Sequence, residues 1–147
     1  MKFKLLINPD QEESIEARVR HETSFTNDLR QFVLTNGKSD QIVAYDDKDL
    51  ITLRLSKISM ITILDHKTMV ITTDNKKYQI KKRIYQLVDE LPNNFWRINK
   101  SSIVNRCQVA RFAETQTAGV NIIMKNGITD YVSRRCFVKI RKKLEQS

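Results

Sequence analysis

Apolar and polar residues alternate with a period of two over residues 3–7 and 15–20, near the start of the chain. Such alternation is typical of β-strands, and the proline-containing breaker between the two segments marks a turn. From Ser24 the apolar residues recur instead on one helical face, and Asn36-Gly37 supplies a stop signal. The pattern predicts a leader over residues 1–40 with two paired strands and a short helix.

The alternating pattern returns after the leader and predicts two hairpins. One spans residues 41–55 and turns at the charged sequence DDKD. The other spans residues 58–74 and turns at His66-Lys67-Thr68, and a further strand over residues 76–81 carries lysines on its polar face.

The remaining chain mixes strands with two short helices. Apolar residues over 84–91 share one helical face, and this helix is expected to end at Pro92. Strands are predicted over residues 107–114, 119–126 and 128–133, and a basic helix from about Arg134 ends the chain. The sequence therefore predicts a mainly β (α+β) domain over residues 41–147, behind the leader of residues 1–40.

Positive charge is concentrated in the predicted β domain. Residues 1–45 carry 6 lysines and arginines against 7 aspartates and glutamates, whereas residues 46–147 carry 20 against 10. A basic domain behind a near-neutral leader indicates an anionic partner, either nucleic acid or anionic lipid, although many basic proteins simply carry a solvated charged face. The basic residues Lys81, Lys82 and Arg83 cluster at the start of the helix predicted from residue 84. Cations are unfavourable at a helix N-terminus, so either a phosphate bound there or a merely solvated basic turn would explain their position.

Several function classes are disfavoured by what the chain lacks. No apolar run approaches the roughly eighteen residues of a membrane span, and the N-terminus lacks the apolar core of a signal peptide, so a cytoplasmic protein is expected. Cys107 and Cys136 form no CxxC pair and lie far in sequence from His21 and His66, which argues against a metal site and against a Cys-His nucleophile. We expect no metal, no cofactor and no enzymatic activity.

The stretch FWRINKSSIVNR, residues 95–106, places many hydrogen-bonding side chains between a few apolar anchors. Together with the helix that ends near a proline, the later Asn-Gly pair and the closing Ser-Arg-Arg, its spacing resembles the LytTR family of bacterial DNA-binding domains. The similarity extends over roughly residues 45 to 145. The matching residues are Phe95, Arg97, Lys100, Ser101, Val104, Asn105, Asn126, Gly127, Ser133, Arg134 and Arg135.

The resemblance implies an elongated β sandwich that reads DNA with loops placed in successive major grooves. Carried over by position, Lys100 reads a base, with Asn99 beside it, and an arginine of the pair Arg134 and Arg135 reads another. Asn99 has the equally weighted alternative of shaping the loop through an Asx turn.

A third contact region is expected at the hairpin tip with His66 and Lys67, for which a plain surface turn is the alternative. Phosphate contacts are expected from residues that surround the three loops. These are Ser101, Lys81, Lys82, Arg83, Arg97 and Lys139.

The expected partner is double-stranded promoter DNA with repeated half-sites, bound by a homodimer. The leader is too short for a receiver domain, and the resemblance adds a small membrane protein as a possible restraint on the regulator. The leader would then serve dimerisation or partner docking. The main alternative is a basic β module for RNA or single-stranded nucleic acid, which needs exposed aromatic platforms. The aromatic residues fall mostly at positions predicted to face the core, which disfavours this alternative.

Overall fold

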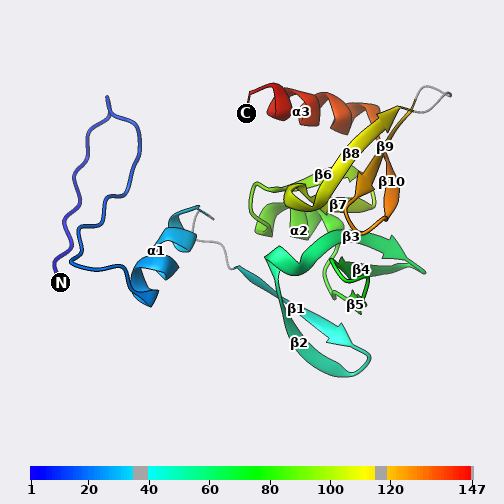
Figure 1. Ribbon diagram of the computed structural model, residues 1–147, viewed down its shortest axis with the longest axis horizontal. Coiled ribbons are helices and arrows are strands. Elements are labelled where there is room, and N and C mark those ends of the chain that lie inside the picture. The colour runs from blue at the N-terminus through cyan, green and yellow to red at the C-terminus, as the bar shows by residue number, and fades with distance from the viewer. Residues whose placement is uncertain (35–39, 115–118, 147) are drawn as a thin grey trace.

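The structure is a computed structural model that describes residues 1–34, 40–114 and 119–146. Its strands form a seven-stranded antiparallel sheet, in the order β2-β1-β5-β4-β3-β7-β6, and a three-stranded sheet, in the order β10-β9-β8. The strands are β1 (Gln41–Asp46), β2 (Asp49–Arg54), β3 (Ile58–Leu64), β4 (Lys67–Thr72), β5 (Lys77–Gln79), β6 (Phe95–Asn99), β7 (Ser102–Asn105), β8 (Val109–Glu114), β9 (Val120–Met124) and β10 (Thr129–Val132). The helices are α1 (Ser24–Leu34), α2 (Ile84–Glu90) and α3 (Arg134–Glu145). The mainly β prediction is confirmed (Figure 1).

Both predicted hairpins are present, and left-handed turn residues close them. In the β3–β4 hairpin, Asp65 and His66 have φ angles of 49° and 63°, which suit the mirror-image turns that match strand twist. The tight turn therefore lies one residue earlier than the sequence predicts, and Lys67 already opens β4. In the β1–β2 hairpin Asp47 adopts the left-handed conformation in the same way, with a φ of 57°.

Two apolar cores lie on opposite faces of the central strands. Because side chains alternate along a strand, Ile103 of β7 joins one core while its neighbour Val104 joins the other. The first core packs α2 onto the seven-stranded sheet, and the second joins that sheet to the three-stranded sheet and α3. Strand β7 is consequently buried along its whole length.

Two asparagine side chains form hydrogen bonds to the backbone of other segments near the ends of β7 and β9. Asn105 Nδ2 donates to the carbonyl oxygens of Leu55 and Ile58, at 3.3 and 2.9 Å, and its Oδ1 accepts from Cys107 N–H. Asn126 Nδ2 donates to Thr72 O across the two sheets at 3.1 Å, and Gly127 completes this turn with a φ of 89°. These two asparagines of the matching motif therefore stabilise the fold.

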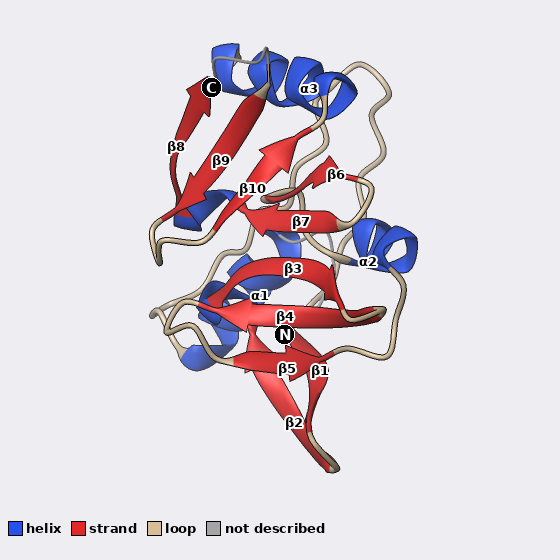
Figure 2. Ribbon diagram, turned by 90° about the vertical axis from the view of Figure 1, so that its right-hand side faces the viewer, coloured by secondary structure: helices blue, strands red, loops and turns tan. Residues whose placement is uncertain are grey.

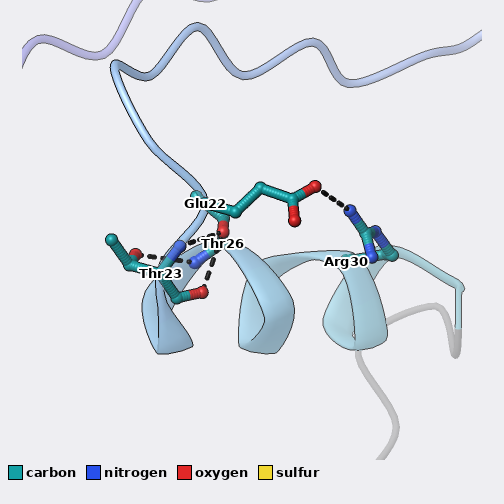
Figure 3. A network of polar contacts seen from close by, with 4 residues as sticks. All are labelled: Glu22, Thr23, Thr26 and Arg30. Carbon is teal, nitrogen blue, oxygen red and sulfur yellow. Dashed lines mark hydrogen bonds and ion pairs between the residues drawn. The ribbon is translucent and has the colours of Figure 1, made fainter.

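The leader contains only part of its predicted structure. Helix α1 is present, and Thr23 and Thr26 exchange backbone-to-hydroxyl hydrogen bonds at its start while Arg30 pairs with Glu22 (Figure 3). The stop signal at Asn36-Gly37 lies outside the described residues.

The two strands predicted for residues 3–7 and 15–20 are wrong, because residues 1–23 form no strand. The physical reason is that an isolated pair of strands is marginally stable unless a third strand or a helix covers its apolar face. In the described chain no other element covers the apolar face of the two predicted strands, and Phe3 and Ile7 remain 90% and 83% exposed. Figure 1 shows the extended segment and α1 to one side of the sheets.

Candidate nucleic-acid interface

Three turns that are distant in sequence gather along one edge of the molecule. Thr62 of β3 pairs with Ser102 of β7, so the β3–β4 turn and the β6–β7 turn extend from the same end of neighbouring strands. Ser133 N–H donates to Ile98 O at 2.8 Å, which places the start of α3 beside β6. Figure 2 shows the two turns and the start of α3 along its right-hand side. The sequence predicted these three contact regions, and the fold brings them together.

The β6–β7 turn presents Lys100 to solvent on a tightly held backbone. Asn99 pairs with Ser102 across the turn, next to an irregularity in the pairing of β6 with β7. The Arg97 guanidinium donates to Asn99 O and to Lys100 O, each at 3.1 Å. Arg97, predicted as a phosphate contact, thus also clamps this turn. A rigid turn loses little conformational entropy on binding.

Asn99 does not project toward solvent, contrary to the expectation from the sequence. Its side chain is only 2% exposed, Nδ2 donates to Tyr131 O at 2.8 Å, and Oδ1 accepts from Ser101 N–H at 2.8 Å. Because Asn99 is buried and its Nδ2 and Oδ1 each bond within the protein, its amide is not presented to a base edge. The structure therefore favours the alternative, in which Asn99 shapes the turn.

Arg134 and Arg135 are the first two residues of α3, and both are exposed. Ser133 caps the helix, since its Oγ accepts from Cys136 N–H at 3.2 Å. Cations at a helix N-terminus oppose the helix dipole, and the first turn of α3 holds no acidic residue that would offset this. An external anion would remove the conflict. Lys139 lies one helical turn beyond Arg135 and is also exposed.

His66 and Lys67 are exposed at the β3–β4 turn, and the segment between β5 and α2 lies next to this turn. Ile80 N–H donates to Thr68 O at 2.8 Å, and this hydrogen bond holds the two segments side by side. The basic residues that follow Ile80 therefore approach the same edge as His66. They are Lys81, Lys82 and Arg83.

Contacts within the protein stabilise the basic residues that precede α2. Lys81 Nζ lies 4.2 Å from the centre of the Tyr45 ring, and Lys82 forms an exposed ion pair with Glu90. Arg83 N–H donates to Gln86 Oε1, which caps the first turn of α2. A phosphate is therefore not required to account for these charges, although an exposed ion pair contributes little and leaves Lys82 able to exchange partners.

An open groove of about 650 Å³ separates the β3–β4 side of the edge from β10. Ser102 and Asp130 lie in its wall, and the Ser102 hydroxyl bonds to Asp130 and, at 2.7 Å, to Thr62 Oγ1. The sequence gives no signal for Asp130 or Tyr131, because neither is a matching residue of the motif and each contacts its partner only in the folded chain. Ser102 lay within the polar stretch that drew attention, yet its binding partners could not be inferred.

Aromatic side chains are more often buried or half-buried in the β domain than in the leader. Within the described part of residues 41–147, the exposed aromatic side chains are Tyr85 and Tyr131, which are 59% and 55% exposed. The expectation of core-facing aromatic residues is wrong for the leader, where Phe3, Phe25 and Phe32 are exposed. Tyr85 lies on α2 and Tyr131 on β10, so they do not form adjacent stacking platforms on one strand.

The described parts of the chain contain neither a cluster of metal-binding side chains nor a helix that could span a membrane. No group of three or more His, Cys, Asp or Glu side chains there could hold a metal ion. Across residues 1–34, 40–114 and 119–146, no helix is both long and apolar enough to cross a membrane. Cys107 is exposed and Cys136 is half-buried, and both are free thiols.

Comparison with known proteins agrees with the fold. The chain is 28% identical, over 145 residues and 98% of both chains, to proteins named uncharacterized HTH-type transcriptional regulators from Staphylococcus aureus strains MRSA252, N315 and Mu50. Its fold matches the LytTr DNA-binding domain of a Bacillus cereus protein described as a methyl-accepting/DNA response regulator. This match has a TM-score of 0.66 and 22% identity and covers 72% of this chain and 97% of that one.

The name of the staphylococcal relatives refers to a helix-turn-helix, but in the described parts of this chain strands β6 to β10 lie between α2 and α3, so these two helices do not form such a pair. The family model that matches, over residues 48–145, is the LytTr DNA-binding domain, a class of DNA-binding domains and not of enzymes. The matched range agrees with the similarity inferred from the sequence. The chain therefore belongs to the LytTR family of DNA-binding domains.

Proposed function

We propose that this protein is a transcription regulator that binds double-stranded promoter DNA in a sequence-specific manner and reads major-groove bases with its turns. The observation that carries the proposal is the single edge on which the β6–β7 turn, the α3 start and the β3–β4 turn meet. Each of these turns exposes at least one basic side chain. DNA presents a regular row of phosphates and base edges, which suits several contacts along one line.

Lys100 and Arg135 are the proposed base readers of this edge, with Arg134 as the alternative to its neighbour. Lysine and arginine donate to guanine O6 and N7, and they are the commonest specific readers in the major groove. His66 and Lys67 would contact DNA at the β3–β4 turn. Asn99 is not proposed as a reader, because its side chain is buried and engaged with Tyr131 and Ser101.

Residues that flank the readers would hold the DNA backbone. Helix α3, which carries Lys139, and helix α2, which follows the basic cluster, lie on either side of the β6–β7 turn (Figure 2). Contacts to phosphates set register and affinity without reading sequence. The proposed phosphate contacts are Ser101, Lys81, Lys82, Arg83, Arg97 and Lys139.

Selection from random duplex tests the function as a whole. We expect rounds of enrichment with the full chain to yield one recurrent duplex motif, and we expect titrations to rank that duplex above single-stranded DNA and RNA of the same sequence. Equal affinity for the three would favour the alternative of a module for RNA or single strands. An enriched pool without any shared duplex motif would contradict sequence-specific reading.

We propose further that two copies bind repeated half-sites and that the leader joins them. The leader exposes apolar side chains, among them Leu6 and Phe32, which are 77% and 59% exposed. Its charge is close to neutral, so two leaders would not repel each other as two basic domains do. A small membrane protein, which the resemblance implies as a restraint, would compete for the same apolar surface.

Removing residues 1–40 should leave the β domain folded and weaken its self-association. Among the described residues, neither apolar core includes one that precedes Ile42, so we expect the β domain to pack without the leader. Far-ultraviolet circular dichroism should retain the β signal, and sedimentation should give a smaller average mass than the full chain at equal concentration. An unfolded truncated protein would place the domain boundary elsewhere, whereas unchanged self-association would exclude the leader as the dimer interface.

A further inference from the structure

The β6–β7 turn and the junction between β10 and α3 are joined through one buried side chain. Asn99 Nδ2 donates to Tyr131 O in β10, and Asn99 Oδ1 accepts from Ser101 N–H within its own turn, each at 2.8 Å. Next to this side chain, Ser133 N–H donates to Ile98 O at 2.8 Å. Lys100 therefore follows a residue that is bonded to the strand leading into Arg134 and Arg135.

We propose that Asn99 is a positioning residue that holds the two turns in one register and thereby sets base discrimination at both. The inference rests on the proposed reading function of Lys100 and Arg135. Asn99 acts through the backbone of its neighbours and makes no contact with DNA, since its exposed fraction is 2%.

The chemistry of the asparagine side chain explains why one residue can join the two turns. The amide offers a donor and an acceptor on one short, planar group, and the site uses both at once. Aspartate lacks the donor, and leucine lacks both. Loss of the amide would leave the partly buried groups Tyr131 O and Ser101 N–H without these partners, which favours rearrangement of the turn.

When Asn99 is truncated, we expect the β6–β7 turn and the start of α3 to become more mobile relative to each other but to stay in contact, because other hydrogen bonds still join them. The bond from Ser133 N–H to Ile98 O joins main-chain atoms, and the Arg97 clamp on Asn99 O and Lys100 O also involves the main chain of the turn. Both persist in Asn99→Ala. Small displacements weaken directional contacts to base edges far more than contacts to flexible, diffuse phosphate charge.

The test is a base-substitution scan of the selected duplex with four proteins: the wild type, Lys100→Ala, Arg135→Ala and Asn99→Ala. The first two variants identify the base position that each reader recognises. We expect Asn99→Ala to lower discrimination at both positions by about tenfold, which is the size of one good base contact. Its affinity for random duplex should change by less than about twofold, because phosphate contacts dominate that affinity.

Asn105→Ala is the matched control, since Asn105 is also an asparagine on this hairpin and is also 2% exposed. Its bonds lie at the other end of β7, on Leu55 O and Ile58 O, so it should lower stability without changing the ratio of specific to random affinity. All binding is measured below the unfolding transition of each variant. If Asn99→Ala does not fold, Asn99→Ser replaces it, because the shorter hydroxyl retains polarity without the reach of the amide.

The possible results separate the inference from the function beneath it. Loss of discrimination at one base position alone, not shared with Lys100 or Arg135, would make Asn99 a direct reader and overturn the inference. Unchanged discrimination at both positions would overturn it as well. If Lys100→Ala and Arg135→Ala leave every base preference intact, the assignment of readers is wrong, and if the wild type has no base preference, the proposed function itself is wrong.

Discussion

Lys100→Ala and Arg135→Ala are each expected to weaken binding to the preferred duplex by about 1 to 3 kcal/mol, with a much smaller loss on random duplex. Both side chains are exposed, Lys100 in the β6–β7 turn and Arg135 in the first turn of α3. Each truncation removes a donor to a base edge, and a wrong or missing partner in the major groove costs discrimination directly. Fluorescence anisotropy with the selected duplex and with random duplex, at one salt concentration, measures the two losses.

Lys139→Ala supplies the matched contrast on the same helix. Lys139 follows Arg135 by four residues, so both side chains lie on one face of α3. As a phosphate contact, Lys139 should affect both duplexes alike, and its removal should reduce the slope of log affinity against log salt concentration by about one unit. Equal losses on specific and random duplex for Lys100→Ala and Arg135→Ala, in folded protein, would make these residues positional contacts.

Arg134→Ala resolves which arginine of the pair reads a base. Both residues are exposed in the first turn of α3, and the helix geometry directs neighbouring side chains about 100° apart. Only one of them is therefore expected to face the groove. A loss of discrimination confined to Arg134→Ala would transfer the reading role from Arg135 to its neighbour without changing the proposed surface.

Sequence periodicity predicted the elements of the β domain because each has a face that the fold buries. The helix over residues 84–90 and the hairpin over residues 41–54 follow this rule. The leader strands failed for the same reason, since alternation specifies a strand only where another layer covers its apolar side. The β3–β4 turn was displaced by one residue because Asp65 and His66 both accept the left-handed conformation.

The sequence predicted the three segments that the fold brings to one edge, but not the partners of their polar side chains. The motif located Lys100 and the arginine pair, yet it could not distinguish an amide that faces DNA from one that faces Tyr131, which is 32 residues away in sequence. The ion pair of Lys82 with Glu90, eight residues further along the chain, was not predicted either. Long-range partners of polar residues depend on topology, and local spacing carries no information about them.

Asn105→Ala is expected to lower the free energy of unfolding by about 2 to 4 kcal/mol, because three backbone groups, two of them in buried bonds, lose a hydrogen bond to this side chain. Leu55 O and Ile58 O would lose the amide donor, and Cys107 N–H would lose its acceptor. These bonds connect the end of β7 with the entry into β3, next to the first apolar core. Chemical denaturation of the wild type and the variant measures the difference.

Asn105→Asp separates the hydrogen bonds from the packing volume, since the carboxyl group has nearly the shape of the amide. It retains the acceptor for Cys107 N–H but directs a carboxylate oxygen, in place of a donor, at Leu55 O and Ile58 O. Burial of an unpaired charge is costlier than loss of a neutral bond, so we expect Asn105→Asp to be at least as destabilising as Asn105→Ala. Near-wild-type stability of both variants would contradict a structural role for Asn105. Lost stability with an unchanged ratio of specific to random affinity would instead place Asn105 in the scaffold, and Lys100 and Arg135 would carry the reading.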